Sequence, residues 1–258
     1  MITSSSNPQI KSIIQLNKST KARRENGLFA AEGIKMFQEA PAEWVEKVYF
    51  SESLAREEPW LTAEKKGPCE IVSDTVFRQM SDTQTPQGIL TLLHIPRWRE
   101  EDLYHGDGLY LVLEDLQDPG NLGTMIRTAE GAGFHGIFMT KTCVDLTNPK
   151  VIRSTMGSVF RVPCLQVQDI SQATQLLHTW GVCLYAAHLE GENPYDLEDY
   201  IPGSAFMIGN EGKGLTQQGA ACADRWIRIP MQGRLESLNA AMAAGILMYE
   251  AARQRRNL

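Results

Sequence analysis

The chain has 258 residues, of which 43% are hydrophobic and 22% charged, and these are ordinary values for a globular protein of one large or two medium domains. Its 25 basic and 31 acidic side chains give a net charge of −6, which argues against a nonspecific nucleic-acid binder. We expect no signal peptide and no membrane span, because the first residues lack a basic and apolar leader and no apolar stretch is long enough. The five cysteines are widely spaced without a Cys-x-x-Cys pair, so we expect neither a disulfide framework nor a metal site, and a cytoplasmic location.

The first part of the chain predicts a small α/β domain over residues 1–93. Helices are expected at 7–26, 33–40 and from near Asp74, and strands at 28–33, 45–50, 70–73 and 88–93. Residues 1–35 carry six basic and two acidic side chains, a local charge of +4. Two interpretations stay open for this segment, a solvated helix face or contact with phosphates.

Residues 94–108 are expected to form a linker, and the alternation of elements becomes more regular from residue 109. Expected strands lie at 109–115, 136–140, 161–167, 182–187, 205–209 and 226–229, and expected helices at 121–132, 149–158, 169–180, 214–222 and 238–256. This order predicts a parallel sheet flanked by helices, which binds ligands at the carboxyl ends of its strands.

The first loop of interest follows the apolar strand that ends near Glu114. Asp118-Pro119-Gly120 predicts a tight turn, and Asn121 is of a residue type that caps helices. Arg127 lies about one and a half turns further on, with Glu130 as a possible ion-pair partner. The spacing alone leaves open whether Arg127 is a surface ion pair or a functional residue.

The second loop is Gly209-Asn210-Glu211-Gly212-Lys213-Gly214, directly after an apolar strand. Three glycines in six positions predict close approach of the backbone to a ligand. The loop is not a Walker phosphate-binding loop, because Gly214 follows Lys213 where serine or threonine is required. Gly131–Gly136 matches a dinucleotide-binding string, but it follows a helix and precedes a strand, so we interpret it as a helix end and turn.

The third loop runs from Ile229 through Pro230 and Gly233 to Asn239, before a helix rich in alanine. Ser237 is the expected N-cap of that helix. Small residues at its start favour tight helix packing, whereas the polar residues before it are unexplained by packing alone.

Together the three loops closely resemble, in the same order, the motifs of the SpoU/TrmH family of SPOUT methyltransferases, over residues 109–254. The segment Pro149–Gly157 also fits a family pattern, with Thr155 where serine is commoner. The resemblance implies RNA ribose 2′-O-methylation, S-adenosylmethionine as cofactor, a deep trefoil knot in the sheet domain 109–258, and a homodimer. Residues 1–93 resemble the substrate-binding domain that often precedes this catalytic domain.

The resemblance also implies roles for particular residues. The expected catalytic residues are Arg127, Asn121, Glu211, Ser237 and Asn239. The expected cofactor-binding residues are Gly209, Ile229, Leu238, Met231 and Ile208. The expected RNA-binding residues are Lys21, Arg23, Arg24 and Arg153.

We expect ribosomal RNA rather than transfer RNA as the substrate, from the type of N-terminal domain. A transfer-RNA methyltransferase and a non-catalytic RNA-binding or ribosome-assembly protein of the same fold are the alternatives. A different nucleotide-binding enzyme with a doubly wound sheet is a third possibility, but the sequence lacks the phosphate-binding motif that such an enzyme needs. Arginine is protonated at all ordinary pH values, so Arg127 could handle the proton only indirectly, by holding a phosphate or the ribose.

Overall fold

The computed structural model describes residues 1–64 and 66–256 and consists of two compact units. Unit 1 comprises Met1–Arg97 and Asp145–Phe160, and unit 2 comprises Trp98–Val144 and Arg161–Leu258. A segment from the middle of the chain therefore packs with the N-terminal part. The functional division into a substrate-binding domain 1–93, a linker and a methyltransferase domain 109–258 remains a prediction.

Unit 1 is built on a four-stranded mixed sheet with the order β1-β4-β2-β3. β4 pairs antiparallel with both β1 and β2, and β2 pairs parallel with β3. The strands are β1 (Leu28–Glu32), β2 (Val45–Ser51), β3 (Cys69–Val72) and β4 (Ile89–His94), as predicted to within two residues. The helices are α1 (Pro8–Lys18), α2 (Thr20–Asn26), α3 (Ile34–Glu39), α4 (Glu52–Glu57), α5 (Pro59–Ala63), α6 (Asp74–Met80) and α9 (Pro149–Thr155).

The single helix expected over 7–26 is interrupted at Ser19. This residue has an extended backbone, and its hydroxyl accepts a hydrogen bond from the N–H of Ala22, so that it ends α1 and caps α2. Serine favours caps over helix interiors because its side chain competes for nearby backbone groups. The short helices α4 and α5 were not predicted from the sequence.

Unit 2 is built on a parallel sheet of seven strands with the order β7-β6-β5-β10-β8-β11-β9. The strands are β5 (Leu109–Leu113), β6 (Gly136–Thr140), β7 (Cys164–Val167), β8 (Cys183–Ala187), β9 (Asn193–Pro194), β10 (Ser204–Ile208) and β11 (Arg225–Arg228). Six of these confirm predicted strands, and only the two-residue β9 was missed. Gly131–Gly136 spans the turn between α8 (Pro119–Gly131) and β6, as predicted.

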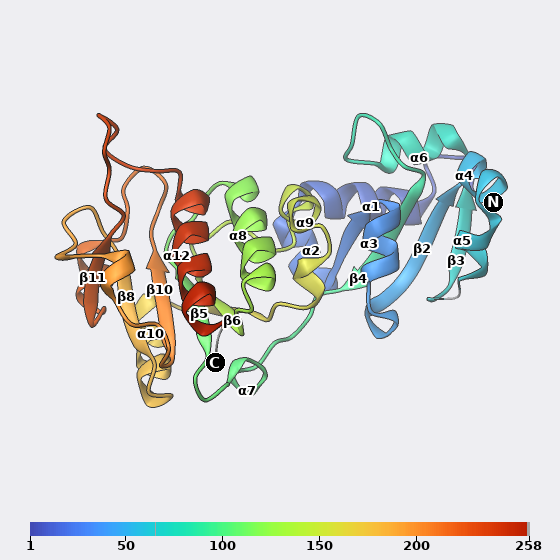
Figure 1. The fold of residues 1–258 in the computed structure, drawn as a ribbon. Helices are drawn as coiled ribbons and strands as arrows, with labels where there is room; N and C mark the ends of the chain where they lie inside the picture. Colours follow the sequence, from blue (N-terminus) through green and yellow to red (C-terminus); the bar gives the residue numbers. More distant parts are fainter. Residues whose placement is uncertain (65, 257–258) are drawn as a thin grey trace. The chain divides into compact units, whose positions relative to one another are not determined.

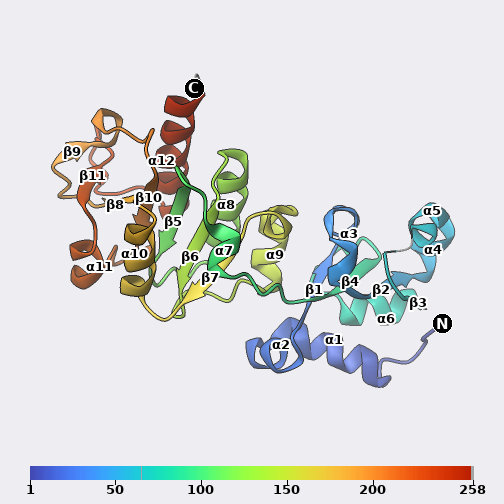
Figure 2. The same cartoon turned by 90° about the horizontal axis from the view of Figure 1, so that it is seen from below.

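Helices cover both faces of the parallel sheet (Figures 1 and 2). The helices α8 and α12 (Ala240–Arg255) lie side by side on one face, and α10 (Ile170–Thr179) lies on the other. The remaining helices are the short α7 (Glu100–Leu103) and α11 (Gln217–Ala221). Every residue of β5, β6 and β10 is buried, which explains why these strands are almost entirely apolar in the sequence.

The parallel order brings the carboxyl ends of β5, β10, β8 and β11 to one edge of the sheet. The three loops singled out in the sequence follow β5, β10 and β11, and therefore meet at that edge. The trefoil knot implied by the resemblance remains a prediction. No helix in the described part of the chain is long and apolar enough to cross a bilayer.

Candidate active site

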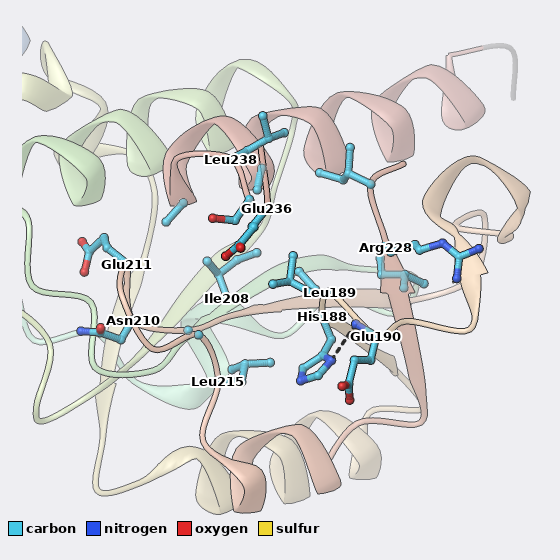
Figure 3. A pocket seen from close by; sticks show the side chains of 18 of the residues that line it. His188, Leu189, Glu190, Ile208, Asn210, Glu211, Leu215, Arg228, Glu236 and Leu238 are labelled. Atoms are coloured by element: carbon cyan, nitrogen blue, oxygen red, sulfur yellow. Dashed lines mark hydrogen bonds between the residues drawn. The ribbon is translucent and has the colours of Figure 1, made fainter. Parts of the chain in front are cut away.

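A cavity of about 860 Å³ opens at the carboxyl edge of the sheet in unit 2 (Figure 3). This volume is in the range of small-molecule sites. Its walls are the loops that follow β8, β10 and β11, together with the beginning of α12. The lining residues are Ala187–Glu190, Ile208–Leu215, Ile227–Met231, Glu236–Leu238, Ala240, Ala243 and Leu247.

The loop after β10 is closed on itself, and Gly209 makes this possible. A Cβ atom at Gly209 would lie 2.1 Å from the carbonyl carbon of Gly214 and from the nitrogen of Leu215, which no real structure tolerates. The N–H of Asn210 donates to the carbonyl of Gly214 (3.0 Å), and the N–H of Gly214 donates back (2.8 Å). The loop therefore presents a fixed backbone to the cavity.

Three residues that lie far apart in the sequence form one hydrogen-bonded chain beside this loop. The carboxylate of Glu211 accepts from the amide of Asn121 (3.1 Å), and the side-chain oxygen of Asn121 accepts from the amide of Asn239 (3.0 Å). Glu211 also accepts from the backbone N–H groups of Gln117 (3.1 Å) and Asp118 (2.8 Å). The structure thus joins all three loops through the predicted residues Asn121, Glu211 and Asn239.

The same contacts determine the charge of Glu211. Partial burial raises the pKa of its carboxyl, but the N–H groups of Asp118 and Gln117 and the amide of Asn121 outweigh this effect and hold the pKa below its usual value. Glu211 is therefore an ionised acceptor that organises neighbouring groups rather than a proton donor.

Two expected helix caps are wrong, and the correction explains the hydrogen-bonded chain. Asp118, not Asn121, caps α8 by accepting from the N–H of Asn121 (2.7 Å). Asn239, not Ser237, caps α12 by accepting from the N–H groups of Ala241 (2.9 Å) and Met242 (3.2 Å). Several cap-forming residue types stand within three positions of each start, so the sequence did not distinguish them. Asn121 can join Glu211 to Asn239 because its side chain is not needed as a cap.

Arg127 lies on α8, is exposed and does not line the cavity. Its possible partner Glu130 pairs instead with Arg161, whose guanidinium donates to both carboxylate oxygens. The surface-pair interpretation of Arg127 is therefore wrong. No ion pair or hydrogen bond of the Arg127 side chain is present in the described chain, which leaves its guanidinium available for a ligand.

All five residues expected to bind the cofactor line the cavity, namely Ile208, Gly209, Ile229, Met231 and Leu238; Ser237 lines it as well. Sequence reasoning missed the wall formed by His188, Leu189 and Glu190, which directly follow β8. Their position after a buried parallel strand, next to the strands of the recognised loops, was the available signal.

Arg23 corrects the prediction of an RNA contact. It is only 2% exposed, and its guanidinium donates to the Asp145 carboxylate (2.5 and 3.0 Å), the Thr147 hydroxyl (3.1 Å) and the Leu16 carbonyl (2.6 Å). A buried guanidinium with these partners holds unit 1 together and is not presented to a phosphate.

The other three basic residues expected to bind RNA are accessible. Lys21 and Arg24 are exposed on α2, and Lys21 forms an ion pair with Glu25 at 3.7 Å. Arg153 on α9 is partly exposed and pairs with Asp82 at 3.0 Å. Exposed ion pairs of this kind contribute little stability, so a phosphate can replace the carboxylate at small cost.

Both the N-terminal and the C-terminal part of the chain are similar to known proteins. A family model described as the SpoU rRNA Methylase family matches residues 108–249, and one described as an MRM3-like substrate binding domain matches residues 7–91. An uncharacterized tRNA/rRNA methyltransferase of Synechocystis sp. is 34% identical over 98% of this chain and 93% of its own length. The 23S rRNA (guanosine(2553)-2′-O)-methyltransferase RlmP of Bacillus subtilis is 32% identical over 96% of this chain and 97% of its own.

Among solved structures, the AdoMet-bound rRNA methyltransferase of Sinorhizobium meliloti is similar with a TM-score of 0.84. It is 31% identical in sequence, and the match covers 98% of this chain and 97% of that one.

Proposed function

The chain belongs to the SpoU rRNA methylase family, and on that basis we propose that it methylates a ribose 2′-hydroxyl of ribosomal RNA with S-adenosylmethionine as the methyl donor. The observation that carries the proposal is the cavity walled by the second and third motif loops, with the first motif loop joined to both beside it through Asn121, Glu211 and Asn239. A non-catalytic RNA-binding protein has no need of this cavity.

The residues present fit the methyl donor. The cavity has the volume for a nucleoside with an amino-acid tail, and the glycine at position 209 lets the loop after β10 close on itself and present a fixed backbone to the ligand. Ile208, Ile229 and Leu238 would hold the apolar parts of the donor. The donor supplies an electrophilic methyl group to the ribose oxygen.

The chain's own residues then have to position the RNA and handle one proton. The guanidinium of Arg127 suits a phosphate, which it can bind through two parallel N–H groups. A phosphate oxygen held next to the ribose would accept the proton of the 2′-hydroxyl, so Arg127 acts without losing its own proton. Glu211 keeps the start of α8, and with it Arg127, at a fixed place relative to the cavity.

The choice of ribosomal RNA rests on the relatives and on unit 1. RlmP is named for 23S rRNA, and residues 7–91 match a substrate-binding domain. Lys21, Arg24 and Arg153 would contact the RNA backbone. Transfer RNA is the alternative substrate, because the relative from Synechocystis is named for both.

The working form of the enzyme would be a homodimer. Met242 and Tyr249 on α12 are 61% and 55% exposed, and their spacing of seven residues places them on the same face of the helix. A second copy is the partner that would cover them. Sedimentation equilibrium distinguishes the states, since a monomer at micromolar concentration would contradict this part of the proposal.

Calorimetric titration with S-adenosylmethionine tests the proposed function. We expect one site per chain with micromolar affinity. Absence of binding would favour the non-catalytic alternative. Incubation of the protein and methyl donor with either ribosomal or transfer RNA would then identify the substrate class.

A further inference from the structure

A buried carboxylate at the end of β5 has no part in the chemistry described above. Glu114 is 9% exposed and directly follows β5. One carboxylate oxygen accepts from the backbone N–H of Thr216 (2.8 Å), and the other accepts from the Thr216 hydroxyl (2.8 Å). Burying a carboxylate is costly unless its oxygens are hydrogen-bonded, and here a single residue supplies both donors.

Thr216 directly follows the loop Gly209–Leu215, which forms one wall of the cavity. Its hydroxyl donates to Glu114 and at the same time accepts from the N–H of Gly219 (2.9 Å), so it also caps α11. A Cβ atom at Gly219 would lie 2.6 Å from the Glu114 carboxylate. The first turn of α11 is therefore packed directly against Glu114.

The backbone of Glu114 holds the other end of the same loop. Its N–H donates to the carbonyl of Ile208 (2.9 Å), the last residue of β10. Glu114 thus contacts both Ile208 and Thr216, and every residue from Ile208 to Leu215 lines the cavity. Glu114 therefore fixes the distance between the two ends of this loop, Ile208 and Thr216.

We propose that Glu114 is a positioning residue that sets the shape of the methyl-donor cavity through Thr216. This inference rests on the proposed function, since the ligand is the methyl donor. Without the contact between Thr216 and Glu114, the loop would sample other conformations. The apparent affinity for the methyl donor would then fall in proportion to the fraction of molecules whose loop keeps the binding-competent conformation.

The test uses the full chain and calorimetric titration with S-adenosylmethionine. Thr216→Val removes the hydroxyl and keeps the shape of the side chain, whereas Thr216→Ser keeps the hydroxyl. We expect Thr216→Val to weaken binding about tenfold, the effect of losing a hydrogen bond to a charged group, and Thr216→Ser to bind within about twofold of the wild type. Glu114→Gln keeps the volume and removes the charge, and we expect weaker binding there too.

Thr174→Val is the matched control. Thr174 is 3% exposed on α10, and its hydroxyl donates to the Ser171 carbonyl away from the cavity. This variant should lose some stability and no affinity. Circular dichroism establishes that each variant is folded.

The outcomes distinguish the proposed function from the positioning role. If the wild type fails to bind the donor, the proposed function fails. If the wild type binds and the folded variants Thr216→Val and Glu114→Gln bind equally well, the positioning role of Glu114 is wrong. Equal weakening by Thr216→Ser and Thr216→Val would also contradict it, because the hydroxyl would then not be the group that matters.

Discussion

Replacing Arg23 with methionine would remove a buried charge partner while retaining most of the apolar stem. The Arg23 guanidinium makes two hydrogen bonds to Asp145 and further ones to Thr147, Leu16 and Thr20, all within unit 1. The variant leaves the Asp145 carboxylate, which is mostly buried, without its counter-charge.

The expected cost follows from this geometry. Removal of one partner of a buried ion pair destabilises a protein by about 3–5 kcal/mol, a large part of the roughly 5–15 kcal/mol that stabilises a typical domain. Arg24→Met is the matched control, since the neighbouring Arg24 side chain is exposed and should contribute at most about 0.5 kcal/mol.

Urea denaturation followed by circular dichroism measures both variants. A cost below about 1 kcal/mol for Arg23→Met, or equal costs for the two variants, would refute the structural role of Arg23.

The pH dependence of the free energy of unfolding provides a second check. Burial raises the pKa of Asp145, but the hydrogen bonds and charge of Arg23 outweigh it and leave the pKa below its usual value.

A carboxyl whose folded-state pKa is lowered contributes stability above its unfolded pKa, and this contribution is lost as the pH falls through the folded-state pKa. The difference in stability between wild type and Arg23→Met should therefore be full at neutral pH and shrink below about pH 4, near the reference pKa of aspartate. A difference that stays constant down to about pH 2 would mean that Asp145 is not the partner that matters.

The remaining predictions concern the cavity and the RNA. Gly209→Ala should weaken S-adenosylmethionine binding at least about tenfold in calorimetry, because the new Cβ would overlap the backbone of the same loop; unchanged affinity would mean that the loop is not the binding wall. Arg127→Lys should reduce kcat at least about tenfold with donor affinity unchanged, since lysine lacks the guanidinium fork; near-normal turnover would exclude that role. Lys21→Ala with Arg24→Ala should weaken RNA binding and flatten its salt dependence, by about one unit of slope for each phosphate that the protein no longer neutralises; an unchanged slope would place the RNA elsewhere.

The central strands of the sheet of unit 2 were predictable because they are almost entirely apolar. Leu109–Leu113 and Ser204–Ile208 are covered on both faces, so burial left a direct trace in the sequence. The loop after β10 was predictable from its three glycines, whereas Asn121 was wrongly expected to cap α8 and its place in the site came from the resemblance of its loop to a family motif. Parallel strands then require the loops to meet at one edge.

Long-range pairing of polar groups was not predictable. Arg23 has the same residue type as its neighbour Arg24, and only the Asp145 carboxylate, 122 positions away, makes one a core residue and the other a surface residue. Glu114 is a similar case, because its partner Thr216 lies 102 positions away. Periodicity and capping preferences are local properties and carry no information about such partners.

Locating the methyl group on the RNA tests the central claim most directly. Ribosomal RNA from cells that lack this protein would be incubated with the purified protein and S-adenosylmethionine, and 2′-O-methylated riboses detected by their resistance to alkaline cleavage. We expect one new protected ribose with the wild type and none with Arg127→Ala. Methyl groups found on bases, or no new methylation with a wild-type protein that binds the donor, would contradict the account.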